Sequence, residues 1–125
     1  MEPGIALRMS RLFNAQTGKS LVIAIDHGIE GVPNGLEDPL AKVDELMQAG
    51  VDALLLNPGL FQRVAGLWKT RSGPGVVLAA DYFMGRTVPG RAVKSEEYRT
   101  IITIEDAVRL GADAVKMVLV FGQRD

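Results

Sequence analysis

The sequence predicts an α/β fold built on a parallel sheet, in a single domain over residues 1–125. Short, continuously apolar segments alternate along the chain with segments whose apolar residues recur at helical spacing. Residues Ala49–Gly59 also resemble Leu110–Gly122, and each stretch combines a helix end, a tight turn and a new strand. Four strand–helix units of this kind fit either a small doubly wound sheet of the flavodoxin type or the first half of a (β/α)8 barrel.

Two strands and two helices are predicted in the first part of the chain. Leu21–Asp26 is apolar up to its closing aspartate, which is typical of a strand buried on both faces. Asp38 can cap a helix that carries a proline in its first turn and ends before Gly50. Asp52–Leu56 follows as a second strand, and Leu60–Lys69 as a second helix because its apolar residues recur at helical spacing.

In the second part of the chain the sequence predicts two more strands and a helix, with a long loop after the first of these strands. Val76–Asp81 repeats the pattern of an apolar strand that ends in aspartate. Tyr82–Thr100 shows no periodicity and predicts a long loop, which is often functional in a compact domain. A threonine followed three residues later by an aspartate predicts a capped helix over Thr103–Leu110, and Asp113–Phe121 predicts the fourth strand.

The composition excludes several classes of protein. Fourteen Lys and Arg residues oppose fifteen Asp and Glu, giving a net charge of −1, whereas nucleic-acid binding normally needs a basic excess. The longest apolar runs, such as Leu21–Ile25, are far shorter than the roughly 20 residues of a membrane-spanning helix, and no signal-peptide pattern opens the chain, so we expect a cytoplasmic protein. Without cysteine and with one histidine, His27, the sequence predicts no metal site of Cys or multiple His ligands.

Polar side chains stand where the predicted strands end. Asp26 with His27, Asn57 and Asp81 follow three of the apolar runs. In both architectures ligands bind at the carboxyl ends of parallel strands, so these side chains predict a polar pocket. The alternative is that Asp26 and Asp81 only start turns or cap helices, which aspartate often does.

Lys116 interrupts an otherwise apolar strand, where an ammonium group is costly without a partner. Strand alternation places it on one face with Val118 and leaves Val115 on the other, so the apolar face should contact the helices. We therefore expect Lys116 to point into the pocket and to pair with Asp26 or Asp81. It could serve as a structural ion pair, as a ligand for a substrate anion, or as an amine nucleophile.

Two further candidates have equally good structural explanations. His27 could relay a proton beside Asp26, but neighbouring residues of a strand point to opposite faces, so a structural histidine explains it at least as well. Arg86 and other basic residues of the long loop could bind a phosphate group, although a solvated loop or a subunit contact explains them as well.

Three segments together resemble a known enzyme family. R-L-F-N-A-Q-T-G-K-S-L-V-I-A-I-D-H-G at Arg11–Gly28, G-V-D-A-L-L-L-N-P-G at Gly50–Gly59 and L-G-A-D-A-V-K at Leu110–Lys116 are similar to the start of the archaeal-type class I fructose-bisphosphate aldolases. That family belongs with the deoxyribose-phosphate and tagatose-bisphosphate aldolases. The resemblance implies a (β/α)8 barrel, of which this chain would form roughly the first four units. It also implies a Schiff-base mechanism without metal or cofactor and a phosphorylated ketose or related sugar phosphate as substrate.

The resemblance assigns roles by position. Asp26 matches the catalytic aspartate of the first strand, and Lys116 matches a lysine that assists catalysis in the tagatose-bisphosphate branch. Val120 stands where the fructose-bisphosphate branch has a tyrosine acid, and the imine-forming lysine belongs to a sixth strand beyond Asp125. An alternative uses Lys116 itself as the imine-forming amine within a dimer, and another is a non-catalytic, self-assembling or ligand-binding flavodoxin-like domain. A half barrel would leave strand edges open, so we expect a homo-oligomer.

Overall fold

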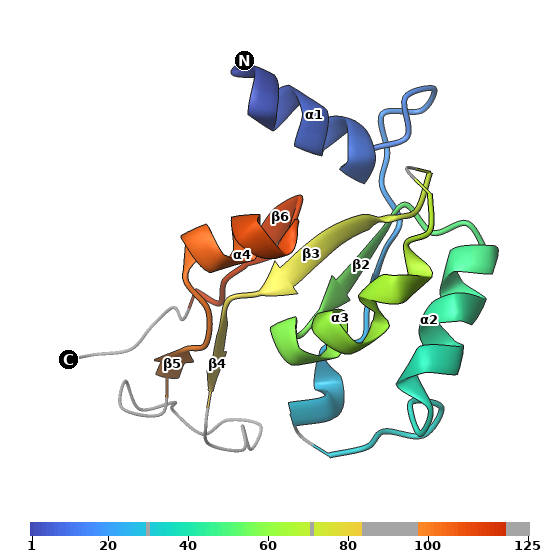
Figure 1. The fold of residues 1–125 in the computed structure, drawn as a ribbon, viewed down its shortest axis with the longest axis vertical. Helices are drawn as coiled ribbons and strands as arrows, with labels where there is room; N and C mark the ends of the chain where they lie inside the picture. Colours follow the sequence, from blue (N-terminus) through green and yellow to red (C-terminus); the bar gives the residue numbers. More distant parts are fainter. Residues whose placement is uncertain (30, 71, 84–97, 120–125) are drawn as a thin grey trace.

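The computed structural model describes residues 1–29, 31–70, 72–83 and 98–119. Its main sheet has four parallel strands in the order β1 (Val22–Ala24), β2 (Ala53–Leu56), β3 (Gly75–Ala79) and β6 (Ala114–Lys116) (Figure 1). The prediction of a parallel α/β sheet is therefore confirmed. The strands lie in the order in which the chain makes them, whereas a flavodoxin-like sheet places its first strand between the second and the third.

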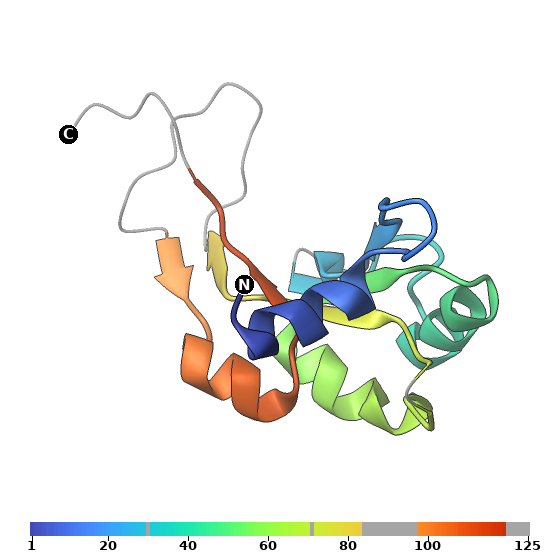
Figure 2. The same ribbon diagram turned by 90° about the horizontal axis from the view of Figure 1, so that it is seen from above.

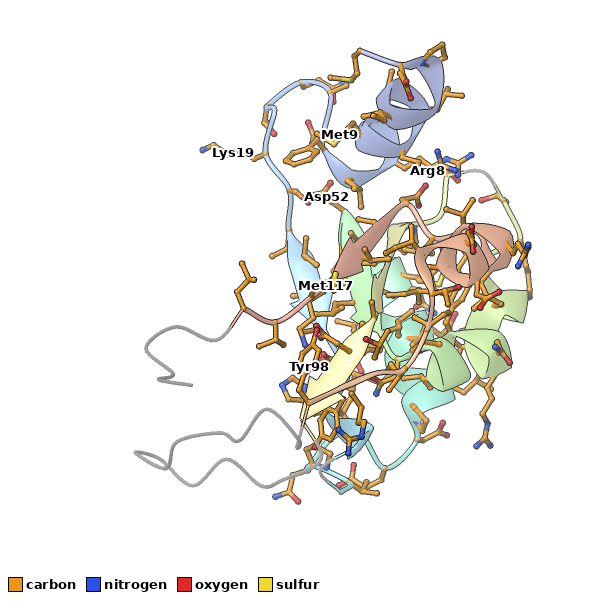
Figure 3. The ribbon with its side chains drawn as sticks, turned by 90° about the vertical axis from the view of Figure 1, so that its left-hand side faces the viewer. Arg8, Met9, Lys19, Asp52, Tyr98 and Met117 are labelled. Carbon is orange, nitrogen blue, oxygen red and sulfur yellow. The ribbon has the colours of Figure 1, made fainter. Side chains whose placement is uncertain are left out.

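Three helices cover one face of this sheet. They are α2 (Pro39–Gln48), α3 (Pro58–Val64) and α4 (Ile104–Leu110), and Figures 2 and 3 show them on the same side of the strands. None of the described helices is long and apolar enough to cross a membrane. The buried core fills the space between the three helices and the sheet. The largest buried members of this core are Ile25, Leu54, Leu56, Phe61 and Leu78, and Val43, Val64 and Val76 pack with them.

The helices begin where side chains or proline can satisfy their first turn. The Asp38 carboxylate accepts a hydrogen bond from the N–H of the third residue after it, at 3.0 Å, and Thr103 caps α4 in the same way at 3.1 Å. The second helix was predicted to begin at Leu60, but α3 begins two residues earlier because Pro58 suits the first helical position. It continues as the short 3-10 helix η2, Ala65–Leu67.

The predicted loop Tyr82–Thr100 is wrong at both of its ends. β4 (Asp81–Phe83) and β5 (Tyr98–Thr100) pair as an antiparallel two-stranded sheet, and the residues between them lie outside the described parts of the chain. Partners so far apart in sequence leave no local pattern that could predict the pairing. The predicted fourth strand is also shorter, because β3 ends opposite Lys116 and the chain then turns into β4.

The repeated Gly-x-Asp-Ala segments link neighbouring strands through their aspartates. Asp52 Oδ2 accepts a hydrogen bond from the backbone N–H of Leu21 at 2.7 Å, just before β1. Asp113 Oδ2 accepts one from the N–H of Val76 at 3.0 Å, in β3. Each aspartate precedes a strand and binds the backbone of the strand beside it. The internal repeat is thus a structural device that sets the strands in register.

The helix α1 (Pro3–Leu12), which the sequence analysis did not predict, lies across the end of the sheet where the strands begin (Figure 1). An Arg11–Asp113 ion pair of 3.1 Å fixes it there. It also packs on Gly75, where an added Cβ atom would lie 2.8 Å from Arg11 O and from Leu12 Cδ2. Gly75 is therefore needed for the close approach of α1 to β3.

Replacing Gly75 by alanine is expected to lower the free energy of unfolding by about 1–3 kcal/mol, because α1 must move away from β3. Urea unfolding measures the change. Gly66→Ala is the matched control: an added Cβ atom there meets nothing within 4 Å, so a change within about 0.5 kcal/mol is expected. Equal stability of the two variants would contradict this packing.

Candidate active site

A cavity of about 310 Å³ lies at the carboxyl ends of the parallel strands. The strand residues in its wall, Leu55, Ala79 and Lys116, alternate with residues that pack against the helices, so the cavity is on the face opposite to α2, α3 and α4. The polar side chains that end the predicted strands, Asp26, Asn57 and Asp81, do lie together in its wall. The full lining is Asp26, His27, Leu55, Asn57, Ala79, Asp81, Tyr82, Lys116 and Val118.

An ion pair joins the two outer strands of the sheet across this cavity. Lys116 Nζ lies 3.6 Å from Asp26 Oδ2, and the side chains are 35% and 16% exposed. Lys116 belongs to β6 and Asp26 follows β1, with β2 and β3 between them. In a flat sheet those strands would be about 14 Å apart at the usual spacing. A contact over this span indicates that the sheet curves toward the cavity.

Asn57 connects the end of β2 to the loop after β1. Its Nδ2 atom donates a hydrogen bond of 2.7 Å to the backbone carbonyl of Asp26. The bond fixes the position of Asp26 at the cavity and also the orientation of the Asn57 amide. Among the described residues, the buried Asn57 Oδ1 atom has no hydrogen-bond partner.

Asp81 is the buried charged residue of the described core, only 1% exposed. Its Oδ2 atom accepts hydrogen bonds from the Tyr98 hydroxyl at 2.5 Å and from the N–H of Val118 at 2.8 Å. Its Oδ1 atom is buried and has no partner in the described parts of the chain. The hydrogen bond to Asp81, with smaller effects of burial and of the Asp81 charge, raises the pKa of Tyr98 above 10.0.

The hairpin of β4 and β5 brings Tyr98 to this site, at the opposite end of the sheet from Asp52 (Figure 3). Sequence reasoning missed Tyr98 because it lay within a predicted loop and carried no motif. It likewise missed the backbone N–H of Val118, which no side-chain pattern indicates. The pairing of Asp81 with Tyr98 depends on strand contacts between distant parts of the chain.

The remaining predicted site residues differ in their placement. His27 lines the cavity, with Nδ1 3.8 Å from Asp26 Oδ1 and its side chain 55% exposed. The expectation that the two residues point to opposite faces was wrong, because β1 ends at Ala24 and His27 begins the 3-10 helix η1 (His27–Ile29). Arg86 lies outside the described residues, as does Val120. Within the described ranges, no three His, Cys, Asp or Glu side chains gather as metal ligands.

The fold and the cavity define a parallel α/β protein whose polar groups meet at the carboxyl ends of its strands. A family model described as DeoC/LacD family aldolase matches residues 20–125. The chain therefore belongs to the DeoC/LacD aldolase family, which confirms the aldolase resemblance of its sequence.

Several archaeal proteins are similar to the chain over nearly all of its length. It is 32% identical over 120 residues to an uncharacterized aldolase of Saccharolobus solfataricus, covering 95% of this chain and 43% of the relative. It is 37% identical over 115 residues to the 2-amino-3,7-dideoxy-D-threo-hept-6-ulosonate synthase of Halobacterium salinarum, covering 91% and 40%. A synthase of the same name from Archaeoglobus fulgidus is 28% identical over 117 residues, covering 94% and 41%. The chain thus spans about two fifths of the length of these relatives.

The raised pKa of Tyr98 can be measured directly, because the chain has only two tyrosines. In a Tyr82→Phe variant, ultraviolet absorbance should show phenolate forming with a midpoint above 10.0, and adding Asp81→Ala, which removes the acceptor of the Tyr98 hydroxyl, should lower that midpoint. Because the folded-state pKa is the higher one, this interaction stabilises the fold fully below about pH 10 and is lost as the pH rises through the raised pKa. An unchanged midpoint in the Asp81→Ala protein would contradict the assignment of the raised pKa to Asp81.

Proposed function

We propose that this chain contributes to a class I aldolase, which uses a Schiff base to cleave or form a carbon–carbon bond in a phosphorylated ketose or related sugar phosphate. The observation that carries the proposal is the Asp26–Lys116 ion pair in a cavity at the carboxyl ends of parallel strands. Membership of the DeoC/LacD family supports it. Barrel enzymes of the α/β class place their active sites at this end of the strands.

We further propose that the chain forms roughly the first four units of a (β/α)8 barrel. The sequential order of the four parallel strands and the curvature indicated by the Asp26–Lys116 contact support this architecture. The same strand order disfavours the flavodoxin-like alternative. Since the sheet edges at β1 and β6 carry no further strand among the described residues, we expect them to be covered within the active protein. A homo-oligomer in the cytoplasm stays a prediction.

In the proposed reaction an amine attacks the ketone carbonyl and water leaves, which gives an iminium ion. Cleavage of the carbon–carbon bond then sends its electron pair toward the iminium nitrogen, which gives an enamine, while a base removes the proton of the hydroxyl group whose oxygen becomes the carbonyl of the released aldehyde. Asp26 is our candidate for that base, because its carboxylate lines the cavity beside Lys116. Lys116 holds the carboxylate in place, and the imine-forming lysine belongs to a strand that follows this chain in the family.

A second assignment keeps the reaction but gives the imine to Lys116. Its amine lies in the cavity and is partly exposed, so a substrate carbonyl can reach it. Two of the relatives are named as synthases, so we propose that either assignment can run toward bond formation as well as cleavage. A phosphate group of the substrate would bind elsewhere, with Arg86 as one candidate ligand.

Replacing Asp26 by the isosteric asparagine is expected to lower kcat/KM about 10²–10⁴-fold, the usual contribution of a general base. The assay is the cleavage of ketose phosphates such as fructose 1,6-bisphosphate by the gene product that carries this sequence. Asp44→Asn changes an exposed aspartate on α2 and should leave kcat/KM unchanged. Retained activity in the Asp26 variant would remove Asp26 from the mechanism.

Borohydride reduction in the presence of the same sugar phosphates separates the two lysine assignments. Peptide mapping should find the reduced adduct outside residues 1–125 and leave Lys116 unmodified if our first assignment is right. An adduct on Lys116 would establish the second assignment. If reduction traps no adduct while the sugar phosphate is turned over, the Schiff-base mechanism is wrong.

A further inference from the structure

Among the residues that the structure describes, two buried oxygen atoms in the wall of the cavity have no hydrogen-bond partner. They are Oδ1 of Asn57 and Oδ1 of Asp81, and both residues line the cavity beside Asp26 and Lys116. Buried polar atoms in folded proteins are nearly always paired, because an unpaired one loses its hydration without compensation. Two unpaired acceptors in one cavity indicate that a ligand supplies the missing donors.

Neither oxygen can be satisfied by turning its side chain over. The Asn57 Nδ2 atom is held by the Asp26 carbonyl, so the amide oxygen must remain at its unpaired position. Oδ2 of Asp81 is held by two donors, the Tyr98 hydroxyl and the Val118 N–H, so the other carboxylate oxygen is left over. The protein thus presents two fixed acceptors.

The charges of the cavity show what kind of ligand these acceptors fit. Lys116 is paired with Asp26, whereas Asp81 receives its described hydrogen bonds from neutral groups. Two carboxylates against one ammonium repel a phosphate group and attract hydrogen-bond donors. The hydroxyl groups of a carbon chain meet this requirement, and the phosphate of the same molecule must then lie outside the cavity.

We propose that Asp81 and Asn57 determine substrate specificity by accepting hydrogen bonds from two hydroxyl groups of a polyhydroxylated substrate, and that Tyr98 is a positioning residue for Asp81. The identity of this ligand as a sugar phosphate rests on the proposed function. The two hydroxyl groups lie next to Asp26 and Lys116, so they belong to the reacting part of the carbon chain. A site built in this way rejects an analogue that lacks the hydroxyl.

Asp81→Asn tests the proposal without changing the shape of the side chain. Because two internal donors hold one oxygen, the amide oxygen should take that place and the NH₂ group should replace the unpaired acceptor. The cavity would then offer a donor where the wild-type protein offers an acceptor. A fluorine atom accepts hydrogen bonds but donates none, so a deoxyfluoro sugar distinguishes the two proteins.

The experiment measures kcat/KM and binding by calorimetry for fructose 1,6-bisphosphate and its monodeoxy and monodeoxyfluoro analogues, with the gene product that carries this sequence. In the wild-type protein, loss of a recognised hydroxyl should lower kcat/KM by about 100-fold or more. For Asp81→Asn the preference for hydroxyl over fluorine at one position should shrink at least about tenfold, the equivalent of one lost hydrogen bond. Asn57→Leu should reduce the preference at a second position, and Asp44→Asn should change neither.

Tyr98→Phe separates positioning from a purely structural role. If Tyr98 orients Asp81, kcat/KM should fall more for the parent sugar than for the analogue that lacks the Asp81-bound hydroxyl. An equal fall for both would show a structural effect and overturn the positioning role. The same comparison shows whether the Asp81 variant has misfolded, since a misfolded protein loses activity on the parent sugar and on the analogue to the same extent.

The outcomes keep this inference apart from the proposed function. Unchanged hydroxyl preferences in the Asp81 and Asn57 variants, with imine trapping intact, would overturn the inference alone. Changed preferences in binding without any trapped imine would support the inference and overturn the Schiff-base mechanism. If none of the sugar phosphates binds or reacts, both are wrong.

Discussion

The arrangement of the site depends on the charge of the lysine within the last parallel strand. An ammonium group on a strand loses part of its hydration and needs a nearby negative charge. Lys116 finds it in Asp26, which lies at the other edge of the four-stranded sheet. A contact between the two ends of the strand order favours a sheet that curves toward the cavity, so one ion pair links the shape of the sheet to the contents of its cavity. Loss of either partner would leave a partly buried charge without its ion-pair partner.

Alternation along the strands allows one short sheet to serve two purposes. Leu54, Leu56 and Leu78 point toward the helices and are fully buried, whereas Leu55, Ala79 and Lys116 line the cavity on the other face. The aspartates of the repeated Gly-x-Asp-Ala segments keep the strands in register at their starts. Register at the start fixes which side chains meet at the end, because a slip by one residue would exchange the two faces.

Local rules explain what the sequence could predict. The capped starts of α2 and α4, the apolar strands and the meeting of Asp26 with Lys116 follow from residue spacing and from the geometry of parallel strands. The helix α1 escaped prediction because it has no side-chain cap and much of its surface is exposed. Tyr98 escaped because its position depends on pairing between β4 and β5, which are far apart in sequence. The roles of the site residues depend on a substrate, and no pattern in the chain supplies that.

Asp81 shows why stability alone does not account for this cavity. A carboxylate that is 1% exposed carries a large loss of hydration, and the described parts of the chain donate hydrogen bonds to only one of its two oxygens. Packing does not require a charge at this place, since a neutral side chain with one acceptor oxygen would serve the Tyr98 hydroxyl and the Val118 N–H with a smaller loss of hydration. Proteins keep such locally unfavourable groups mainly at functional sites, where a ligand completes them. The hydrogen bond from Tyr98 then has a clear purpose, because it holds one oxygen so that the other is always presented to the ligand.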